Sequence, residues 1–158
     1  GKEELLGSMV ANTTREGFRR AMDISVYSFI DCARRASEIM PDGGSIVCMT
    51  YLGAERTVPS YNVMGVAKAA LEASVRYLAA DLGPKNIRVN AISPGYTLTP
   101  MNARGAVADQ NQRFAEETPM GRLATTDEMV GPAVFLASKA SSYVTGIDLI
   151  VDGGFVCW

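Results

Sequence analysis

The chain has 158 residues, of which 47% are hydrophobic and 20% are charged, a length and composition typical of one globular domain with a sizeable core. A formal net charge of −2 disfavours a nucleic-acid partner, and no apolar run is long enough for a membrane span, so no membrane partner is expected. The three widely spaced cysteines, together with an N-terminus that does not have the pattern of a signal peptide, predict a cytoplasmic protein. The sequence has no histidine, which excludes Ser-His-Asp triads and histidine-ligated metals, and no metal site is expected.

Helix-like and strand-like patterns alternate from the N-terminus onward. The capping box Thr13-x-x-Glu16 predicts the start of a long amphipathic helix, which should end before the turn at 41–44. The nearly continuous apolar run 45–51 is typical of a parallel strand that is covered on both faces. A second long helix is expected over about 61–82, because a glycine and a proline follow that segment.

The second half of the chain continues this alternation. The expected elements there are a strand over 87–93, a helix near 104–117, a helix from the capping box Thr125-x-x-Glu128 to about Ala137, and a strand over 148–152. Strands and helices in this order predict right-handed crossovers and a parallel sheet with helices on both faces.

The fold class expected from this order is α/β, the C-terminal part of a Rossmann-like doubly wound parallel sheet with flanking helices. A complete sheet of this kind has about six strands, and the sequence predicts half that number. The glycine-rich phosphate-binding patterns G-x-G-x-x-G and G-x-x-x-x-G-K are both missing from the sequence. Residues 1–158 are therefore interpreted as a single, incomplete domain of this type.

Three residues between 51 and 68 have the chemistry of a catalytic site. Tyr61 and Lys68 are seven residues apart, so on the expected helix they share a face across two turns. A lysine ammonium beside a tyrosine favours the phenolate and lowers the pKa of the tyrosine, which could then donate a proton to a reduced carbonyl or an enolate. Tyr51 ends the preceding strand, where open α/β sheets bind ligands. The same spacing also fits a packed ring and a solvated amine.

The first part of the chain, residues 5–93, resembles the bacterial enoyl-acyl carrier protein reductases, a divergent branch of the short-chain dehydrogenase/reductase superfamily. The matching segments are Tyr51-Leu52-Gly53-Ala54-Glu55-Arg56, Tyr61-Asn62-Val63-Met64-Gly65-Val66-Ala67-Lys68 and Arg88-Val89-Asn90-Ala91-Ile92-Ser93. The spacing Tyr-x6-Lys is the signature of this branch. Ordinary members of the superfamily have Tyr-x3-Lys, which would put the tyrosine at Met64, and they usually have asparagine where this chain has Ser25.

The resemblance implies a role for each of the three residues. Tyr61 would hydrogen-bond the thioester carbonyl and stabilise the enolate, Lys68 would hold the nicotinamide ribose hydroxyls, and Tyr51 would be a second active-site tyrosine. The implied reaction is hydride transfer from NADH or NADPH, with NADH slightly preferred, to the β-carbon of a trans-2-enoyl thioester in fatty acid synthesis. The implied partners are this thioester and the acyl carrier protein, and we also expect a homo-oligomer, a dimer or a tetramer.

The remaining part, residues 94–158, departs from that pattern. Its segment Ser93-Pro94-Gly95-Tyr96-Thr97-Leu98-Thr99 is similar to ordinary short-chain dehydrogenases that act on polyols and ketones. In either branch the backbone after Pro94 and Gly95, together with Thr97 and Thr99, would bind beside the nicotinamide carboxamide. The resemblance thus changes near residue 93, and a ketone or polyol dehydrogenase remains an alternative function.

Roughly the first hundred residues of the family, with the glycine-rich turn that binds the pyrophosphate, have no counterpart in this sequence. The residue that would decide between NAD and NADP belongs to that part. Without it, most contacts to a dinucleotide are lacking and the strand at 45–51 would present an unpaired edge. A third alternative is therefore a non-catalytic fragment that oligomerises and binds no cofactor.

Overall fold

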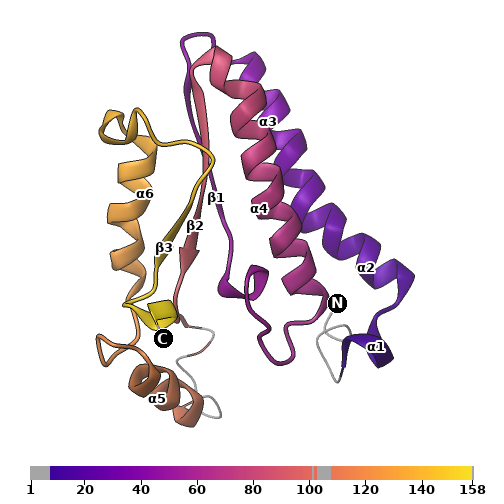
Figure 1. Cartoon of the computed structure of the whole chain (residues 1–158), viewed down its shortest axis with the longest axis vertical. Coiled ribbons are helices and arrows are strands. Elements are labelled where there is room, and N and C mark those ends of the chain that lie inside the picture. The colour runs from indigo at the N-terminus through magenta and orange to yellow at the C-terminus, as the bar shows by residue number, and fades with distance from the viewer. Residues whose placement is uncertain (1–7, 101, 103–107, 158) are drawn as a thin grey trace.

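The computed structural model describes residues 8–100, 102 and 108–157, and within them one parallel sheet is formed (Figure 1). Its strands, in spatial order, are β1 (Gly44–Met49), β2 (Ile87–Pro94) and β3 (Asp148–Val151). β1 pairs with β2 along its whole length, whereas β3 pairs only with the second half of β2. The carboxyl ends of the strands therefore meet at one edge of the sheet, as the sequence predicts.

Helices cover both faces of the sheet (Figure 1). On one face α4 (Val63–Leu82) packs on β2. A long helix lies against α4 and consists of α2 (Arg15–Met22), a π-helical stretch (Asp23–Tyr27) and α3 (Ser28–Glu38). On the other face α6 (Val130–Ala137) packs on β1 and β2. The predicted α/β architecture is confirmed.

Shorter elements connect these layers. They are α1 (Met9–Asn12), α5 (Ala108–Glu117), and 3-10 helices at Leu52–Ala54, Gly83–Lys85, Thr126–Met129, Lys139–Ser141 and Phe155–Cys157. Among the described helices, none has both the length and the apolar composition that crossing a membrane would require.

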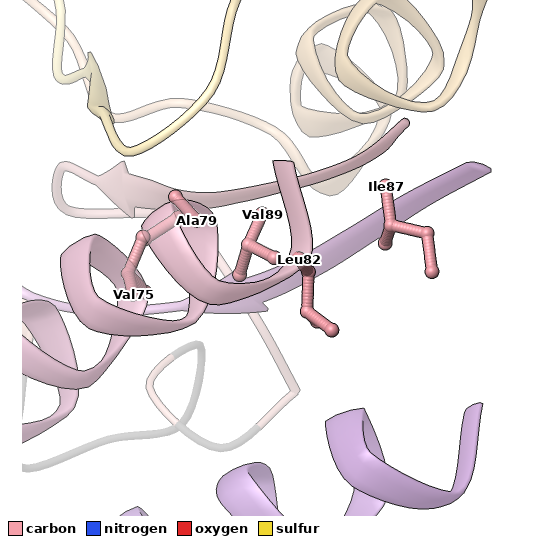
Figure 2. Packing of buried hydrophobic residues seen from close by; sticks show 6 residues of the cluster. Val75, Ala79, Leu82, Ile87 and Val89 are labelled. Atoms are coloured by element: carbon pink, nitrogen blue, oxygen red, sulfur yellow. The ribbon is translucent and has the colours of Figure 1, made fainter. Parts of the chain in front are cut away.

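The hydrophobic core lies between α4 and the sheet (Figure 2). Its buried members are Val75, Ala79 and Leu82 from α4 and Ile87, Val89 and Ala91 from β2. Alternate residues of a strand point to the same face, so these three β2 residues all face α4. The opposite face of β2 is buried as well, because Leu136 of α6 and the side chain of Asn90 are fully enclosed. β2 is therefore buried on both faces, with apolar residues toward α4 and the polar Asn90 on the opposite face.

The start of the first long helix differs from the prediction. Thr14, rather than Thr13, caps α2, and its Oγ1 accepts a hydrogen bond from the Gly17 amide at 2.9 Å. The reason is the unexpected helix α1, whose C-cap is Thr13, because the Thr13 amide donates a hydrogen bond to Met9 O. The Thr13 Oγ1 is buried and has no hydrogen-bond partner.

The second long helix also starts later than predicted, at Val63 instead of Tyr61. Ser60 and Asn62 have positive φ angles of 64° and 44°, and such residues cannot continue a right-handed helix.

In the second half of the chain, the capping box of Thr125 and Glu128 is confirmed and α6 ends at Ala137. The helix expected near 104–117 is α5, and residues 103–107 lie outside the described part.

Candidate active site

Tyr51 and Tyr61 come together at the carboxyl edge of the sheet. Their ring centroids are 4.9 Å apart with an interplanar angle of 64°, which is an edge contact. Tyr51 follows β1, and Tyr61 lies in the turn before α4. A Cβ atom at Gly53 would overlap the Tyr61 ring, so the turn after β1 requires glycine for this approach. The strained backbone around Tyr61 thus places its ring against Tyr51.

Lys68 reaches the same edge from the second turn of α4. Its Nζ donates a hydrogen bond to the Met49 carbonyl oxygen at 2.8 Å, at the last residue of β1. Burial lowers the pKa of Lys68, and the neighbouring Cys48 and Glu72 oppose this shift. Lys68 is therefore bound to Met49, which lies two residues before Tyr51 in the chain, and it lies on the side of α4 that faces the sheet.

The pKa of Tyr61 contradicts the predicted tuning by lysine. Burial, together with the neighbouring Tyr51, raises the pKa of Tyr61 to about 12, and Lys68 does not contribute. The physical reason is that the Lys68 ammonium is bound to the Met49 carbonyl instead of the Tyr61 hydroxyl. At neutral pH Tyr61 is consequently a neutral phenol, which acts as a hydrogen-bond donor.

The segment after β2 forms a second wall of the site. The Gly95 amide donates to Val151 O at 2.8 Å, and a Cβ at Gly95 would lie 2.6 Å from Asp152 Cα, so only glycine fits there. The Thr97 hydroxyl donates to Gly95 O at 3.1 Å, and the amide and hydroxyl of Thr99 both donate to Asn102 Oδ1. These bonds give the segment a defined shape.

An open groove of about 440 Å³ runs between the two walls. Its lining residues are Met49, Thr50, Tyr51, Pro94, Gly95, Tyr96, Thr97, Thr99, Asn102, Thr126 and Met129. The structure therefore brings together five of the predicted residues: Tyr51, Pro94, Gly95, Thr97 and Thr99. Tyr61 lines a different open pocket, of about 360 Å³, and Lys68 meets the groove through its bond to Met49.

Sequence reasoning missed two residues of the site, Glu72 and Tyr96. Glu72 is buried one turn after Lys68 on α4, and it accepts a hydrogen bond of 2.5 Å from the Thr50 hydroxyl. The i, i+4 spacing from Lys68 could have indicated it, since such residues share a helix face. The Tyr96 ring makes an edge contact with the Tyr51 ring and stacks on the ring of Phe114. No sequence pattern signals a contact between segments this far apart.

Carboxyl groups behind the groove are partly desolvated. Burial raises the pKa of Glu72, against the effect of its bond from Thr50, and the nearby Asp148 and Glu55 raise it further. Burial likewise raises the pKa of Asp148, which Arg76 partly offsets from 3.9 Å away. The side of the site next to α4 therefore carries acidic groups that hold protons more tightly than usual.

The raised pKa of Glu72 predicts a pH-dependent stability. The folded protein retains the Glu72 proton at pH values where the unfolded chain has already released it, so wild-type stability falls as pH rises above about 4.5. Glu72→Gln keeps an acceptor for Thr50 and removes this titration. We expect the stability of Glu72→Gln relative to wild type to increase from pH 4 to pH 8.

Urea unfolding at several pH values measures this difference. A difference between Glu72→Gln and wild type that stays constant with pH would contradict the raised pKa.

The fold and the site define a class of protein. A parallel sheet with helices on both faces, and a tyrosine pair and a lysine at its carboxyl edge, is the arrangement of Rossmann-like dehydrogenases and reductases. A family model described as "Enoyl-(Acyl carrier protein) reductase" matches residues 1–156. The chain belongs to this family, within the short-chain dehydrogenases and reductases.

Relatives and solved structures agree with this assignment. The enoyl-[acyl-carrier-protein] reductase [NADH] FabI of Bacillus subtilis (strain 168) is 50% identical over 157 residues, which are 98% of this chain and 60% of the relative. The [NADPH] FabI of Staphylococcus aureus (strain MRSA252) is 50% identical over 155 residues, 97% of this chain and 60% of the relative. The Bacillus cereus reductase, crystallised with NADP+ and indole naphthyridinone, has a TM-score of 0.93 at 44% identity, over 100% of this chain and 62% of that one.

These comparisons carry two further consequences. The chain spans about 60% of the length of the curated relatives that it matches. The similarity extends over nearly the whole chain, so a single family accounts for both the part before residue 93 and the part after it.

Proposed function

We propose that the protein carrying this chain reduces trans-2-enoyl thioesters of acyl carrier protein with NADH or NADPH, in fatty acid synthesis. The observation that carries the proposal is the contact between Tyr51 and Tyr61 beside Lys68, at the carboxyl edge of the sheet. It is supported by the names of the relatives, which are enoyl reductases of both the [NADH] and the [NADPH] kind.

The residues of the groove fit a nicotinamide nucleotide. Within the part of the chain that the structure describes, the Lys68 ammonium donates to Met49 O alone, which leaves two N–H groups for the ribose hydroxyls. Pro94, Gly95, Thr97 and Thr99 line the same groove and would hold the carboxamide. When bound, this cofactor supplies the hydride.

Tyr61 would act on the thioester oxygen. Hydride addition to the β-carbon moves negative charge onto that oxygen, and a neutral phenol can donate a hydrogen bond to it. The pKa of Tyr61, raised to about 12, keeps its proton available for this bond at neutral pH. A solvent proton then completes the reduction at the α-carbon. Tyr51, in edge contact with Tyr61, would complete the wall around the thioester.

Removal of the Tyr61 hydroxyl tests this role. In the full-length protein, Tyr61→Phe should lower kcat for a crotonyl thioester by about 100-fold or more, because one donor to a developing oxyanion has an effect of this size. The dissociation constant of NADH should stay the same. The fully exposed Tyr143→Phe is the matched control and should retain wild-type turnover.

Loss of NADH absorbance follows the reaction in both variants. Equal turnover of Tyr61→Phe and wild type would overturn the role of Tyr61. Reduction of a keto sugar in preference to the enoyl thioester would favour the ketone or polyol alternative, and no reduction of either would favour the non-catalytic one.

Removal of the Lys68 ammonium tests the cofactor site. Lys68→Ala should weaken NADH binding about tenfold or more, since it removes hydrogen bonds from a charged donor. Calorimetric titration of the full-length protein measures this, with the exposed Lys85→Ala as the control. An unchanged affinity of Lys68→Ala would contradict its role as a ribose ligand.

We also propose that the protein is cytoplasmic and forms a homo-oligomer of two or four copies. The three cysteines are free thiols, which supports a reducing compartment. Ile24 and Tyr27 on the long helix and Tyr77 on α4 are 63%, 61% and 77% exposed, and exposed apolar residues often mark interfaces.

Light scattering should give the mass of two or four copies of the protein, and Tyr27→Glu should reduce this mass. The mass of a single copy would contradict this.

A further inference from the structure

The side chain of Asn102 binds both threonines in the wall of the groove that follows β2. Its Oδ1 accepts hydrogen bonds from the Thr99 amide at 2.7 Å and from the Thr99 hydroxyl at 3.1 Å. Its Nδ2 donates to the Thr97 carbonyl oxygen at 2.9 Å. The Asn102 backbone amide adds a bond to the Thr99 carbonyl oxygen at 3.1 Å. Asn102 therefore closes residues 97–102 into a compact turn.

The partners determine which end of the Asn102 amide faces which threonine. A backbone N–H can only donate, so the atom that faces the Thr99 amide must be the oxygen. A backbone carbonyl can only accept, so the atom that faces Thr97 O must be the nitrogen. Because a carbonyl oxygen carries no proton, the Thr99 hydroxyl must be the donor in its bond to Asn102 Oδ1.

The two threonine hydroxyls of the wall are thereby acceptors toward a ligand. The Thr97 hydroxyl also donates to a carbonyl oxygen, that of Gly95, at 3.1 Å. A hydroxyl has one proton and two lone pairs, so a hydroxyl whose proton is engaged can only accept a further hydrogen bond. Thr97 and Thr99 both line the open groove. This wall therefore favours a ligand group that donates N–H.

The wall is attached to the rest of the protein on two sides. On one side the Leu98 amide donates to Ala124 O at 2.7 Å, and the Ala124 amide donates to Tyr96 O at 2.9 Å. On the other side Asn111 of α5 donates from Nδ2 to Asn102 O at 2.7 Å. The hydroxyl acceptors are therefore held in place before a ligand binds, which lowers the entropic cost of binding.

We propose that Asn102 is a positioning residue of the nicotinamide site, which makes the Thr99 hydroxyl an acceptor for the NH2 group of the carboxamide. A primary amide carries two N–H donors, so it complements a wall of acceptors. The proposal rests on the function proposed above, because its ligand is the cofactor of the proposed reductase. Asn102 acts on this cofactor through Thr99.

A cofactor analogue without the N–H donors tests the proposal. The reduced 3-acetylpyridine analogue of NADH has a methyl ketone in place of the carboxamide, so it keeps the carbonyl oxygen and loses the NH2 group. Calorimetric titration of the full-length wild type should give a dissociation constant about fivefold higher for the analogue than for NADH, the effect of one hydrogen bond. Asn102→Ala should weaken binding of NADH about fivefold and change binding of the analogue less than twofold.

Two further variants make this comparison specific. Asn102→Asp keeps an oxygen acceptor for the Thr99 amide and hydroxyl, so it should retain the wild-type ratio of the two dissociation constants. Gln110→Ala removes an exposed amide of α5 and is the control, which should leave both constants unchanged. Equal weakening of both cofactors in Asn102→Ala would overturn the proposal, and so would a wild type that binds the two equally.

Hydrogen exchange measures the contact without cofactor. In the full-length protein the Thr99 amide should exchange with solvent about tenfold faster or more in Asn102→Ala than in wild type, because its acceptor is removed. In Asn102→Asp it should remain slow. Equal exchange in Asn102→Ala and wild type would refute the positioning of Thr99. If the wild type binds no NADH, the proposed function fails and the carboxamide role with it, whereas the exchange rate still decides whether Asn102 holds Thr99.

Discussion

Two side chains of α4 bind the end of β1, and the positions of Tyr51 and Tyr61 both depend on these bonds. Lys68 donates to the carbonyl of Met49, and Glu72 accepts from the hydroxyl of Thr50. The two bonded residues are consecutive, so α4 can neither slide nor rotate relative to the end of the strand. Tyr51 is the next residue after this pair, and Tyr61 lies two residues before the first residue of α4, Val63. A helix fixed to a strand at this point therefore fixes the two rings against each other.

The other wall of the groove depends on polar contacts of β2. The Arg88 guanidinium donates to carbonyls of Leu136 and Ser138, and the buried Asn90 side chain bonds Val144 O and the Ile147 amide. Buried polar groups without partners are costly, so these bonds strongly favour one position of the loop before β3. β3 in turn holds Gly95 through Val151 O. The contacts of β2 thus determine where the segment from Pro94 to Thr99 lies.

The sequence predicts the elements of this fold well, because apolar periodicity and capping residues are local signals. It places the strands within two residues of their observed ends and gives the end of α6 correctly. It fails where a neighbouring element competes for a residue, as at Thr13, which ends α1 and cannot also cap α2. For the candidate site, it predicts Tyr51, Tyr61 and Lys68, which the structure brings to one edge of the sheet, but not their contacts. The bond from Lys68 to Met49 and the ring contact between Tyr96 and Tyr51 depend on tertiary packing, which spacing along a helix does not describe.

The high pKa of Tyr61 bears on the choice between reduction of an enoyl thioester and oxidation of a polyol. Oxidation of an alcohol needs a base that removes the hydroxyl proton, and a tyrosine serves this purpose only when its pKa is lowered toward neutral. Burial instead raises the pKa of Tyr61 to about 12, and the lysine that could lower it is bound to a backbone carbonyl. A neutral phenol is suited to donating a hydrogen bond to an oxygen that gains charge, as the thioester oxygen does during hydride addition. The raised pKa of Tyr61 is therefore compatible with the hydrogen-bond donor role proposed for this residue.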